Sequence, residues 1–240
     1  MSKFSLLSLL FFALISCKQT DIDPLIPDVP KPKEKIDMLC LGDSYTKGQS
    51  VVWGSNFPNQ LADSLKNLSF DVVTDAPRII AQTGWRTDQL KNAIIAATDI
   101  ADSTFSIVTL CIGVNNQYQN TNFDLYAPEF EALLKTAIAR AGGKEARVFV
   151  VSIPDWAFTS YGQQFPGGGT SISAKIDEYN ATNRKIAADY QVNYVDVTPV
   201  SRQGIIQPNL VASDGLHPSA VQYTEWVKLM LPKVKAVLAQ

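Results

Sequence analysis

From residue 36 onward, short apolar runs alternate with longer amphipathic stretches. The runs that predict strands are almost all apolar on both faces, and they cover residues 36–41, 72–81, 105–112, 148–153 and 192–197. Such runs are typical of parallel strands covered on both sides by helices. The pattern therefore predicts a three-layer α/β/α sandwich around a five-stranded parallel sheet.

The segments between these runs predict the helices, at residues 56–68, 87–98, 123–141, 173–190 and 219–238. Segment 123–141 shows the helical period most clearly. Its apolar face consists of Phe123, Tyr126, Phe130, Leu133, Leu134, Ala137 and Ile138, and Gly142-Gly143 ends it. In open parallel sheets, ligands bind beyond the carboxyl ends of the strands. Residues that directly follow the strands are therefore the first candidates for a functional site.

The amino-terminal segment has the pattern of an export signal. Residues 1–16 contain Lys3 and then a largely apolar run that is too short to span a bilayer stably. The run ends in Leu14-Ile15-Ser16-Cys17, which resembles the lipobox of bacterial lipoproteins. That resemblance implies lipidation at Cys17 and an exported lipoprotein, on the periplasmic side of a membrane or at the cell surface. An ordinary signal peptide with an incidental cysteine is the alternative.

Residues 17–35 predict a proline-rich tether between the lipidated cysteine and the folded body. Four prolines lie among charged residues, at positions 24, 27, 30 and 32. At about 3.1 Å per residue, such a tether reaches up to roughly 50 Å from the lipid surface. Residues 36–240 then form the remaining domain.

The composition favours small-molecule chemistry. A chain of 240 residues with 46% apolar and 18% charged residues can bury a full core, and its length suits one domain. The formal net charge of −2 and the single histidine provide neither a basic surface for nucleic acid nor a histidine cluster for a metal. We therefore expect a small-molecule or glycan substrate, and no nucleic acid, metal or cofactor.

Three cysteines are too few for a disulfide-dense scaffold. Cys40 and Cys111 fall in runs that predict neighbouring strands, so we expect them to be buried thiols side by side. A disulfide between them is the alternative, although side chains on adjacent parallel strands seldom meet disulfide geometry.

A serine follows the first predicted strand, in the turn Gly42-Asp43-Ser44. Serine-containing turns are common, and a serine hydroxyl without a base is a poor nucleophile. A base is available in Asp214-Gly215-Leu216-His217-Pro218, where the only imidazole of the chain follows a carboxylate by three residues. Asp214 can orient His217 as in a catalytic triad. It can equally cap the last helix, which Pro218 and Ser219 open.

Two further turns offer hydrogen-bond donors at the same edge of the sheet. The third predicted strand is followed by Gly113-Val114-Asn115-Asn116, in which the Asn115 amide can donate to an oxyanion. Gly84 precedes a predicted helix and can offer its backbone N–H. Each of these residues, taken singly, also suits an ordinary turn or helix cap.

Together, serine, glycine, asparagine and histidine in this order resemble the SGNH hydrolases, also called GDSL esterases or lipases. The similarity spans about residues 36–238 and implies a flavodoxin-like strand order, 2-1-3-4-5. It implies that Ser44 is the nucleophile, His217 the general base, and Asp214 the residue that orients it. The oxyanion hole would consist of the Ser44 and Gly84 N–H groups and the Asn115 side chain. The implied reaction is hydrolysis of a carboxylic ester through an acyl-enzyme.

The chain departs from the family pattern at two positions. Asn116 stands where the family usually has aspartate, and we expect it to alter the support of the oxyanion loop without abolishing activity. Tyr45 stands where leucine is usual, and we expect it to narrow or polarise the pocket.

The long segment 154–170 contains Trp156, Phe158, Tyr161 and Phe165, which predicts an aromatic loop over the site. These rings and Trp85 suit stacking on sugars or lining an acyl groove. The substrate is accordingly either an acetylated carbohydrate or a lipid or lysophospholipid acyl ester. The alternative for this segment is an ordinary surface loop without a role in the site. A non-catalytic, glycan-binding lipoprotein that retains the hydrolase fold is the alternative for the whole chain.

Overall fold

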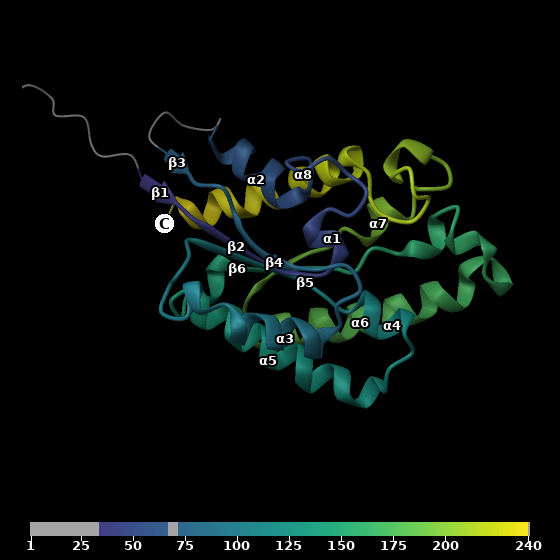
Figure 1. Ribbon diagram of the computed structural model, residues 1–240, viewed down its shortest axis with the longest axis horizontal. Coiled ribbons are helices and arrows are strands. Elements are labelled where there is room, and N and C mark those ends of the chain that lie inside the picture. Colours follow the sequence, from purple (N-terminus) through teal and green to yellow (C-terminus); the bar gives the residue numbers. More distant parts are fainter. Residues whose placement is uncertain (1–33, 67–71, 240) are drawn as a thin grey trace, which may run out of the picture. The chain divides into compact units, whose positions relative to one another are not determined.

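Five parallel strands form the central sheet of the computed structural model, which describes residues 34–66 and 72–239 (Figure 1). They lie in the order β4-β2-β5-β6-β7, and all neighbouring pairs are parallel. Their bounds are β2 (Met38–Gly42), β4 (Arg78–Ala81), β5 (Ile107–Cys111), β6 (Val148–Val151) and β7 (Asn193–Val195). Counted along the chain, this is the predicted order 2-1-3-4-5. The predicted signal peptide and the lipidation site Cys17 lie outside the described residues.

The first two apolar runs are each divided into two strands, so the prediction of one strand apiece was wrong. β1 (Glu34–Ile36) and β3 (Val72–Thr74) form a separate two-stranded parallel sheet. Asp37 lies between β1 and β2, and its carboxylate accepts hydrogen bonds from the backbone N–H and the hydroxyl of Ser106, at 2.7 and 2.8 Å. Pro77 lies in the gap between β3 and β4, where its lack of an N–H prevents a continuous ladder.

Helices cover both faces of the sheet, as predicted (Figure 1). One face is covered by α2 (Phe57–Lys66) and α8 (Ala220–Leu238). The other is covered by α3 (Thr87–Ala96), α5 (Tyr126–Arg140) and α6 (Thr170–Asp189). Three short helices that the sequence pattern did not predict begin just after strands: α1 (Ser44–Lys47), α4 (Val114–Tyr118) and α7 (Thr198–Ser201). They start at the carboxyl edge of the sheet.

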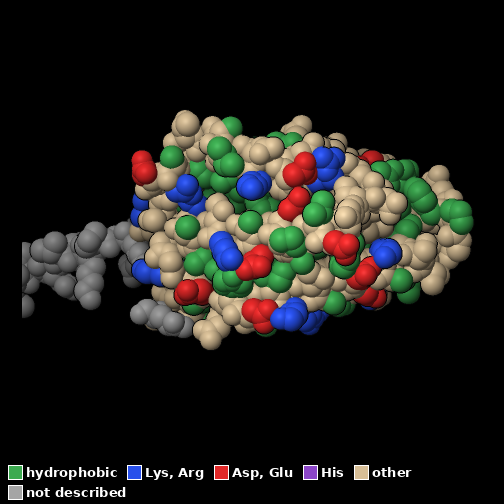
Figure 2. Space-filling view, turned by 90° about the horizontal axis from the view of Figure 1, so that it is seen from below, with side chains coloured by type: hydrophobic (Ala, Val, Ile, Leu, Met, Phe, Trp, Pro, Cys, Tyr) green, Lys and Arg blue, Asp and Glu red, His purple; other side chains and the backbone are tan. Residues whose placement is uncertain are grey.

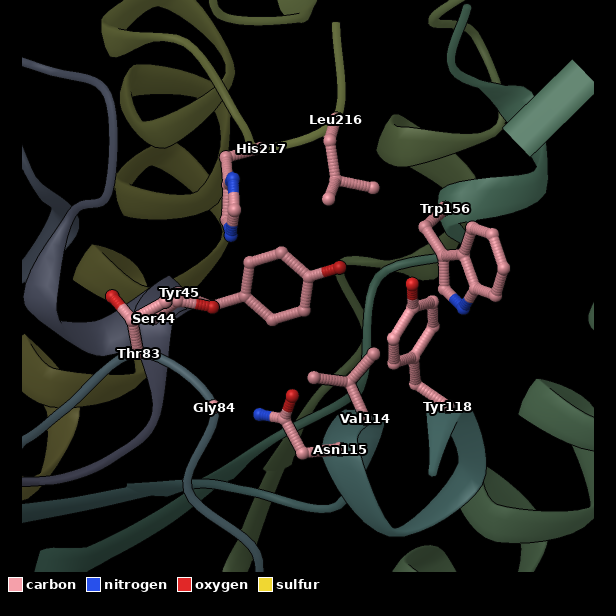
Figure 3. A pocket seen from close by; sticks show the side chains of 10 residues that line it. All are labelled: Ser44, Tyr45, Thr83, Gly84, Val114, Asn115, Tyr118, Trp156, Leu216 and His217. Carbon is pink, nitrogen blue, oxygen red and sulfur yellow. The ribbon is translucent and has the colours of Figure 1, made fainter. Parts of the chain in front are cut away.

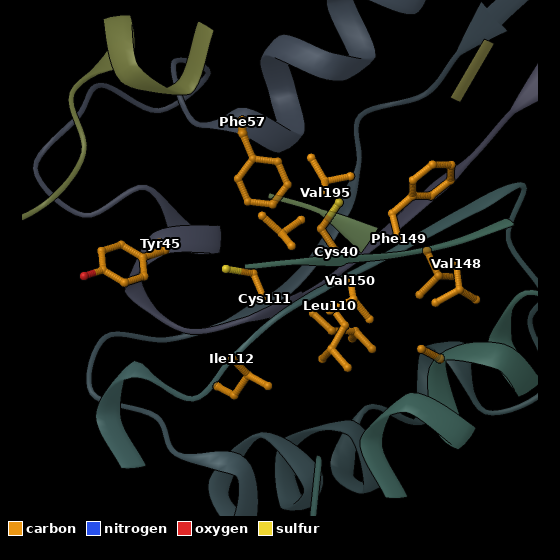
Figure 4. Close-up of a cluster of buried hydrophobic side chains, with 14 of the residues drawn as sticks. Cys40, Tyr45, Phe57, Leu110, Cys111, Ile112, Val148, Phe149, Val150 and Val195 are labelled. Carbon is orange, nitrogen blue, oxygen red and sulfur yellow. The ribbon is translucent and has the colours of Figure 1, made fainter. Parts of the chain in front are cut away.

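The strands are buried on both faces, which explains their continuous apolar sequences. Every residue of β2, β5 and β6 is buried. Along β5 and β6 the side chains alternate between the two helical layers. Figure 4 shows Phe149 on the side of Phe57 from α2, and Leu110 and Val150 on the opposite side.

Cys40 and Cys111 lie on the neighbouring strands β2 and β5 and are both buried and free, as predicted. Cys40 pairs in register with Thr109, and Gly42 pairs with Cys111, so the two thiols are two positions apart. Burial raises the pKa of Cys40 to about 12. Its thiol therefore stays protonated and unreactive at neutral pH.

The surface over α3 and α5 carries charges of both signs, interspersed with apolar side chains (Figure 2). An example is the ion pair of Lys135 with Glu131, one turn apart on α5, at 2.7 Å. Exposed pairs of this kind contribute little to stability, because water screens both charges. No helix in the described part of the chain is long and apolar enough to cross a membrane.

Candidate active site

The loops that follow β2, β4 and β5 meet the turn before α8 in one pocket of about 170 Å³ (Figure 3). This pocket lies at the carboxyl edge of the sheet, where the sequence placed the site. It brings together the four residues that the family resemblance singled out. Its lining consists of Ser44, Tyr45, Thr83, Gly84, Val114, Asn115, Tyr118, Trp156, Leu216 and His217.

Ser44, the predicted nucleophile, is the first residue of the short helix α1. The helix is capped by Asp43, whose Oδ1 accepts a hydrogen bond from the Tyr45 N–H at 3.0 Å. The N–H groups in the first turn of a helix have no partner within the helix. Ser44 therefore presents both its hydroxyl and its own N–H at the end of β2, although only 4% of the residue is exposed.

Asp43 itself, the residue before Ser44, is almost fully buried. Among the described residues, its Oδ2 has no hydrogen-bond partner. Burial raises the pKa of Asp43 to about 7, against the opposing effect of the bond from Tyr45 N–H. Asp43 is thus a helix cap that is only partly ionised near neutral pH.

His217 and Asp214 form one hydrogen-bonded unit. Asp214 Oδ2 lies 2.6 Å from His217 Nδ1, and Oδ1 accepts from the N–H groups of Leu216 and His217, both at 3.0 Å. Partial burial raises the pKa of Asp214, but hydrogen bonds from Ser50, His217 and Leu216 outweigh it and lower that pKa to about 2. The carboxylate is therefore ionised at neutral pH and holds Nδ1, which leaves Nε2 to act as a base.

The alternative role of Asp214 as the cap of the last helix is taken by another residue. Ser219 is the N-cap of α8, and its Oγ accepts from the Gln222 N–H at 3.2 Å. Because Ser219 supplies this cap, both oxygens of Asp214 remain for the turn that carries His217.

Gly84 and Asn115 lie on the opposite side of Ser44 from His217 (Figure 3). The Asn115 amide donates to the Trp85 carbonyl at 3.0 Å, which fixes the side chain and leaves its second N–H for the pocket. Gly84 has φ +85°, and a Cβ there would meet nothing within 4 Å. Glycine is thus favoured here by the backbone conformation, which orients the N–H, and not by lack of space.

Asn116, the departure from the family pattern, is buried and ties two helices together. Its Oδ1 accepts from the Thr87 N–H at 3.1 Å, and its Nδ2 donates to Thr87 Oγ1 at 2.7 Å. The Thr87 hydroxyl in turn donates to the carboxylate of Glu129 on α5. Asn116 therefore supports the loop that carries Asn115, which is the kind of role expected from the sequence.

Ser50 is a residue of the site that sequence reasoning missed. Its hydroxyl donates to Asp214 Oδ2 at 2.6 Å, the same oxygen that accepts from His217. The turn that contains it also binds the Gly84 loop, through Lys47 to Gln82 at 3.1 Å and through Thr83 to Gln49 at 2.7 Å. No local pattern reveals these contacts, because Ser50 and Asp214 are 164 positions apart.

Most of the aromatic segment packs around one pocket residue. Trp156 lines the pocket, and its indole donates to Gln117 Oε1 at 2.9 Å. Phe165 packs edge-on against Trp156, and the hydroxyls of Tyr161 and Tyr118 lie 2.8 Å apart. The segment is built from short 3-10 turns, η4 (Trp156–Phe158), η5 (Gly162–Gln164) and η6 (Pro166–Gly169). Within this segment, Trp156 lines the pocket, whereas Tyr161 and Phe165 pack against Trp156 and do not line it.

The expectation for Trp85 was wrong, because its side chain packs against the hydrophobic core and does not line the pocket. Its carbonyl serves the site instead, by holding Asn115. The sequence did not single out four other wall residues. Three of them are direct chain neighbours of predicted site residues: Thr83, Val114 and Leu216. The fourth, Tyr118, is the last residue of α4.

Comparisons with known proteins agree with this geometry. Residues 40–224 match the model of the GDSL-like lipase/acylhydrolase family. No curated protein matches the chain. A member of the lipolytic G-D-S-L family from Veillonella parvula has a similar structure, with 17% identity, 82% of this chain and 97% of that chain covered, and a TM-score of 0.62.

Two structurally similar proteins are esterases. A psychrotrophic esterase from Pseudoalteromonas sp. has 16% identity, with 85% of this chain and 99% of that chain covered, and a TM-score of 0.62. An acetylxylan esterase from Geobacillus stearothermophilus has 18% identity, with 85% and 95% covered, and a TM-score of 0.59. At these identities the likeness shows a common fold.

Proposed function

Because the chain belongs to the GDSL-like lipase/acylhydrolase family, we propose that it hydrolyses carboxylic esters with Ser44 as nucleophile, His217 as base and Asp214 as the orienting carboxylate. One observation carries the proposal. Segments distant in sequence bring Ser44, His217 with its partner Asp214, Gly84 and Asn115 to one pocket. The family and the esterases among the similar structures support the reaction class.

The proposed reaction has two acyl-transfer steps. His217 Nε2 takes the Ser44 proton while the hydroxyl oxygen attacks the ester carbonyl carbon, and the carbonyl oxygen becomes an oxyanion. The N–H groups of Ser44, Gly84 and the Asn115 side chain donate to that oxygen. The tetrahedral intermediate expels the alcohol, which receives the proton from His217, and leaves an acyl-enzyme. A water molecule, activated by His217, then releases the acid.

Substitution of the nucleophile tests this proposal. Ser44→Ala should lower kcat by roughly 10⁴- to 10⁶-fold, because the remaining donors cannot replace covalent catalysis. A fluorophosphonate probe should label the wild type and fail to label Ser44→Ala. Ser171→Ala, on the exposed side of α6, is the matched control and should retain labelling and activity.

Labelling that persists in Ser44→Ala would refute the assignment of the nucleophile. A wild-type protein that binds glycan but takes no label would instead establish the non-catalytic alternative, a surface glycan-binding lipoprotein. For the enzyme, the two candidate substrate classes are acetylated carbohydrates and lipid or lysophospholipid acyl esters. They differ most in the length of the acyl group.

We also propose that the enzyme is exported and anchored to a membrane through a lipid on Cys17. The proposal rests on the apolar run of residues 4–16 and the lipobox-like Leu14-Ile15-Ser16-Cys17. The proline-rich segment up to residue 35 would then hold the catalytic body away from the lipid surface.

A further inference from the structure

Tyr45 occupies the part of the pocket directly beyond Ser44. The residue is 3% exposed, and its ring packs edge-on against His217 and Trp226, at centroid distances of 5.8 and 6.5 Å. Figure 3 shows its hydroxyl pointing away from Ser44, into the space between Leu216, Trp156 and Val114. The ring therefore limits how far a group attached at Ser44 can extend in this direction.

The reaction geometry indicates which part of the substrate meets Tyr45; this step rests on the proposed function. The tetrahedral carbon carries Ser44 Oγ, the oxyanion, the alcohol oxygen and the acyl chain. The oxyanion lies toward Gly84 and Asn115, and the alcohol oxygen lies toward His217, which protonates it. In Figure 3, His217 lies on one side of the pocket and Gly84 and Asn115 on the other, with the Tyr45 ring between them. The acyl chain is left to run along the Tyr45 ring.

The pocket offers little room for that chain. Its volume of about 170 Å³ is close to that of cavities of roughly 150 Å³ that hold one benzene molecule. The ester group takes part of this space. The pocket is open to solvent on one side, so this space limits the part of the acyl chain that lies against Tyr45, where an acetyl group fits.

The Tyr45 hydroxyl disfavours a long chain for a second reason. Other polar groups of this wall are paired, Tyr118 with Tyr161 and the Trp156 indole with Gln117. The Tyr45 hydroxyl makes no hydrogen bond to another described residue, and it faces the pocket. A methylene chain packed against it would leave the hydroxyl without a polar partner, which reduces binding by about 5- to 100-fold.

We propose that Tyr45 restricts the enzyme to esters of short acyl groups, acetyl above all, and excludes the long-chain lipid esters. The volume of its ring and the polarity of its hydroxyl act together in this selection. The alcohol part of the substrate lies on the His217 side and is not limited by this wall.

A series of p-nitrophenyl esters with a common alcohol tests the proposal, since only the acyl group varies. The quantity is the ratio of kcat/KM for the acetate to that for the octanoate, each corrected for its spontaneous hydrolysis. We expect a ratio of at least about 100 for the wild type. Because both esters use the same His217, a general loss of activity in a variant cancels in the ratio.

Two variants separate volume from polarity. Tyr45→Phe keeps the ring and removes the hydroxyl, and should lower the ratio about 5- to 10-fold. Tyr45→Leu also opens space and should lower it by a further factor of about 10. Tyr194→Leu, the same replacement on the outer strand β7, should leave the ratio unchanged. If Tyr45→Leu fails to fold, the ratio measured for Tyr45→Phe still tests the proposal.

A wild type that prefers the octanoate, or a ratio unmoved in both Tyr45 variants, would overturn the inference. The proposed function survives that result as long as a fluorophosphonate still labels Ser44. Absence of the label together with absence of ester hydrolysis would overturn both.

Discussion

One oxygen of Asp214 accepts two hydrogen bonds of 2.6 Å, from His217 Nδ1 and from the Ser50 hydroxyl. Ser50 has φ +66°, in the left-handed region that side chains with a Cβ seldom adopt. The turn thus holds an unfavourable backbone conformation at the residue whose hydroxyl fixes the carboxylate. This arrangement identifies Ser50 as a positioning residue that acts on His217 through Asp214.

Replacement of Ser50 should therefore affect turnover more than substrate binding. Ser50→Ala removes a hydrogen bond to a charged group at a solvent-exposed position, where water replaces part of it, so kcat should fall by about 3- to 10-fold. KM should stay within about twofold, because Ser50 does not line the pocket. Steady-state kinetics on one ester measure both constants.

The pH dependence follows from the low pKa of Asp214. Ser50 is one of the groups that lower this pKa to about 2, so its removal shifts the pKa upward, toward the ordinary value of 3.8. A depressed carboxylate pKa stabilises the folded state above the unfolded pKa, and that stabilisation is lost only as the pH falls toward 2. Asp214 consequently stays ionised in Ser50→Ala at neutral pH, and the loss of kcat should be equal at pH 7 and pH 8.5.

Glycine at the same position separates positioning from folding. Ser50→Gly suits a positive φ and should keep or raise Tm, yet it should lose as much kcat as Ser50→Ala. Gln191, with φ +55° in the turn before β7, is the matched control, and Gln191→Gly should leave kcat unchanged. Equal activity of Ser50→Gly and the wild type would contradict the role of the hydroxyl.

At the scale of secondary-structure elements, a single row of hydrogen bonds joins α4, α3 and α5. Asn116 donates to the Thr87 hydroxyl, and that hydroxyl donates to Glu129. The direction of donation is fixed at both ends, because an amide N–H₂ can only donate and a carboxylate can only accept. Asparagine at 116 is thus matched to glutamate at 129, which gives the departure from the usual aspartate a physical reason.

This matching predicts a coupled effect on stability. Asn116→Asp should lower the free energy of unfolding by about 1–3 kcal/mol, since Thr87 cannot donate to two carboxylates and one of them loses its partner. Addition of Glu129→Gln should restore most of the loss, because the row then runs from Gln through Thr87 to Asp. Denaturant titrations of the single and double variants give the coupling energy.

The control for this double-mutant comparison is Glu131→Gln, on the same helix, because Glu131 pairs with Lys135. It should not rescue Asn116→Asp. Additive effects of Asn116→Asp and Glu129→Gln would show that the two side chains are not matched through Thr87.

At the scale of the whole molecule, the site and the predicted anchor lie in different parts of the chain. All pocket residues fall between positions 44 and 217, whereas the lipobox-like sequence ends at Cys17. Membrane attachment and catalysis should therefore be separable.

Substitution of the lipidated residue tests this separation. Cys17→Ser in the full chain should abolish incorporation of labelled palmitate and move the protein from the membrane fraction to the soluble fraction. Its kcat/KM on a soluble ester should equal that of the wild type, because the pocket is unchanged. Membrane association that persists without label would contradict the lipid anchor.

The sequence by itself determined the architecture and indicated the residues that the structure brings together in the pocket. Strands that are buried on both faces are continuously apolar, so β5 and β6 were recognisable as short apolar runs. The covering helices were recognisable by the helical spacing of their apolar residues. Candidate residues after the strands, such as Ser44 and His217, were recognisable because the residue type alone shows that each could act as a nucleophile or a base.

Only the tertiary structure decided the contacts between segments that are remote in the chain. Asp37 bonds to Ser106, the support of Asp214 depends on Ser50, and the choice of asparagine at 116 depends on Glu129. None of these pairings leaves a local periodic signal, because a hydrogen bond depends on distance and direction in space. The orientation of Tyr45, on which the proposed selection of short acyl groups depends, is likewise set by its packing against His217 and Trp226.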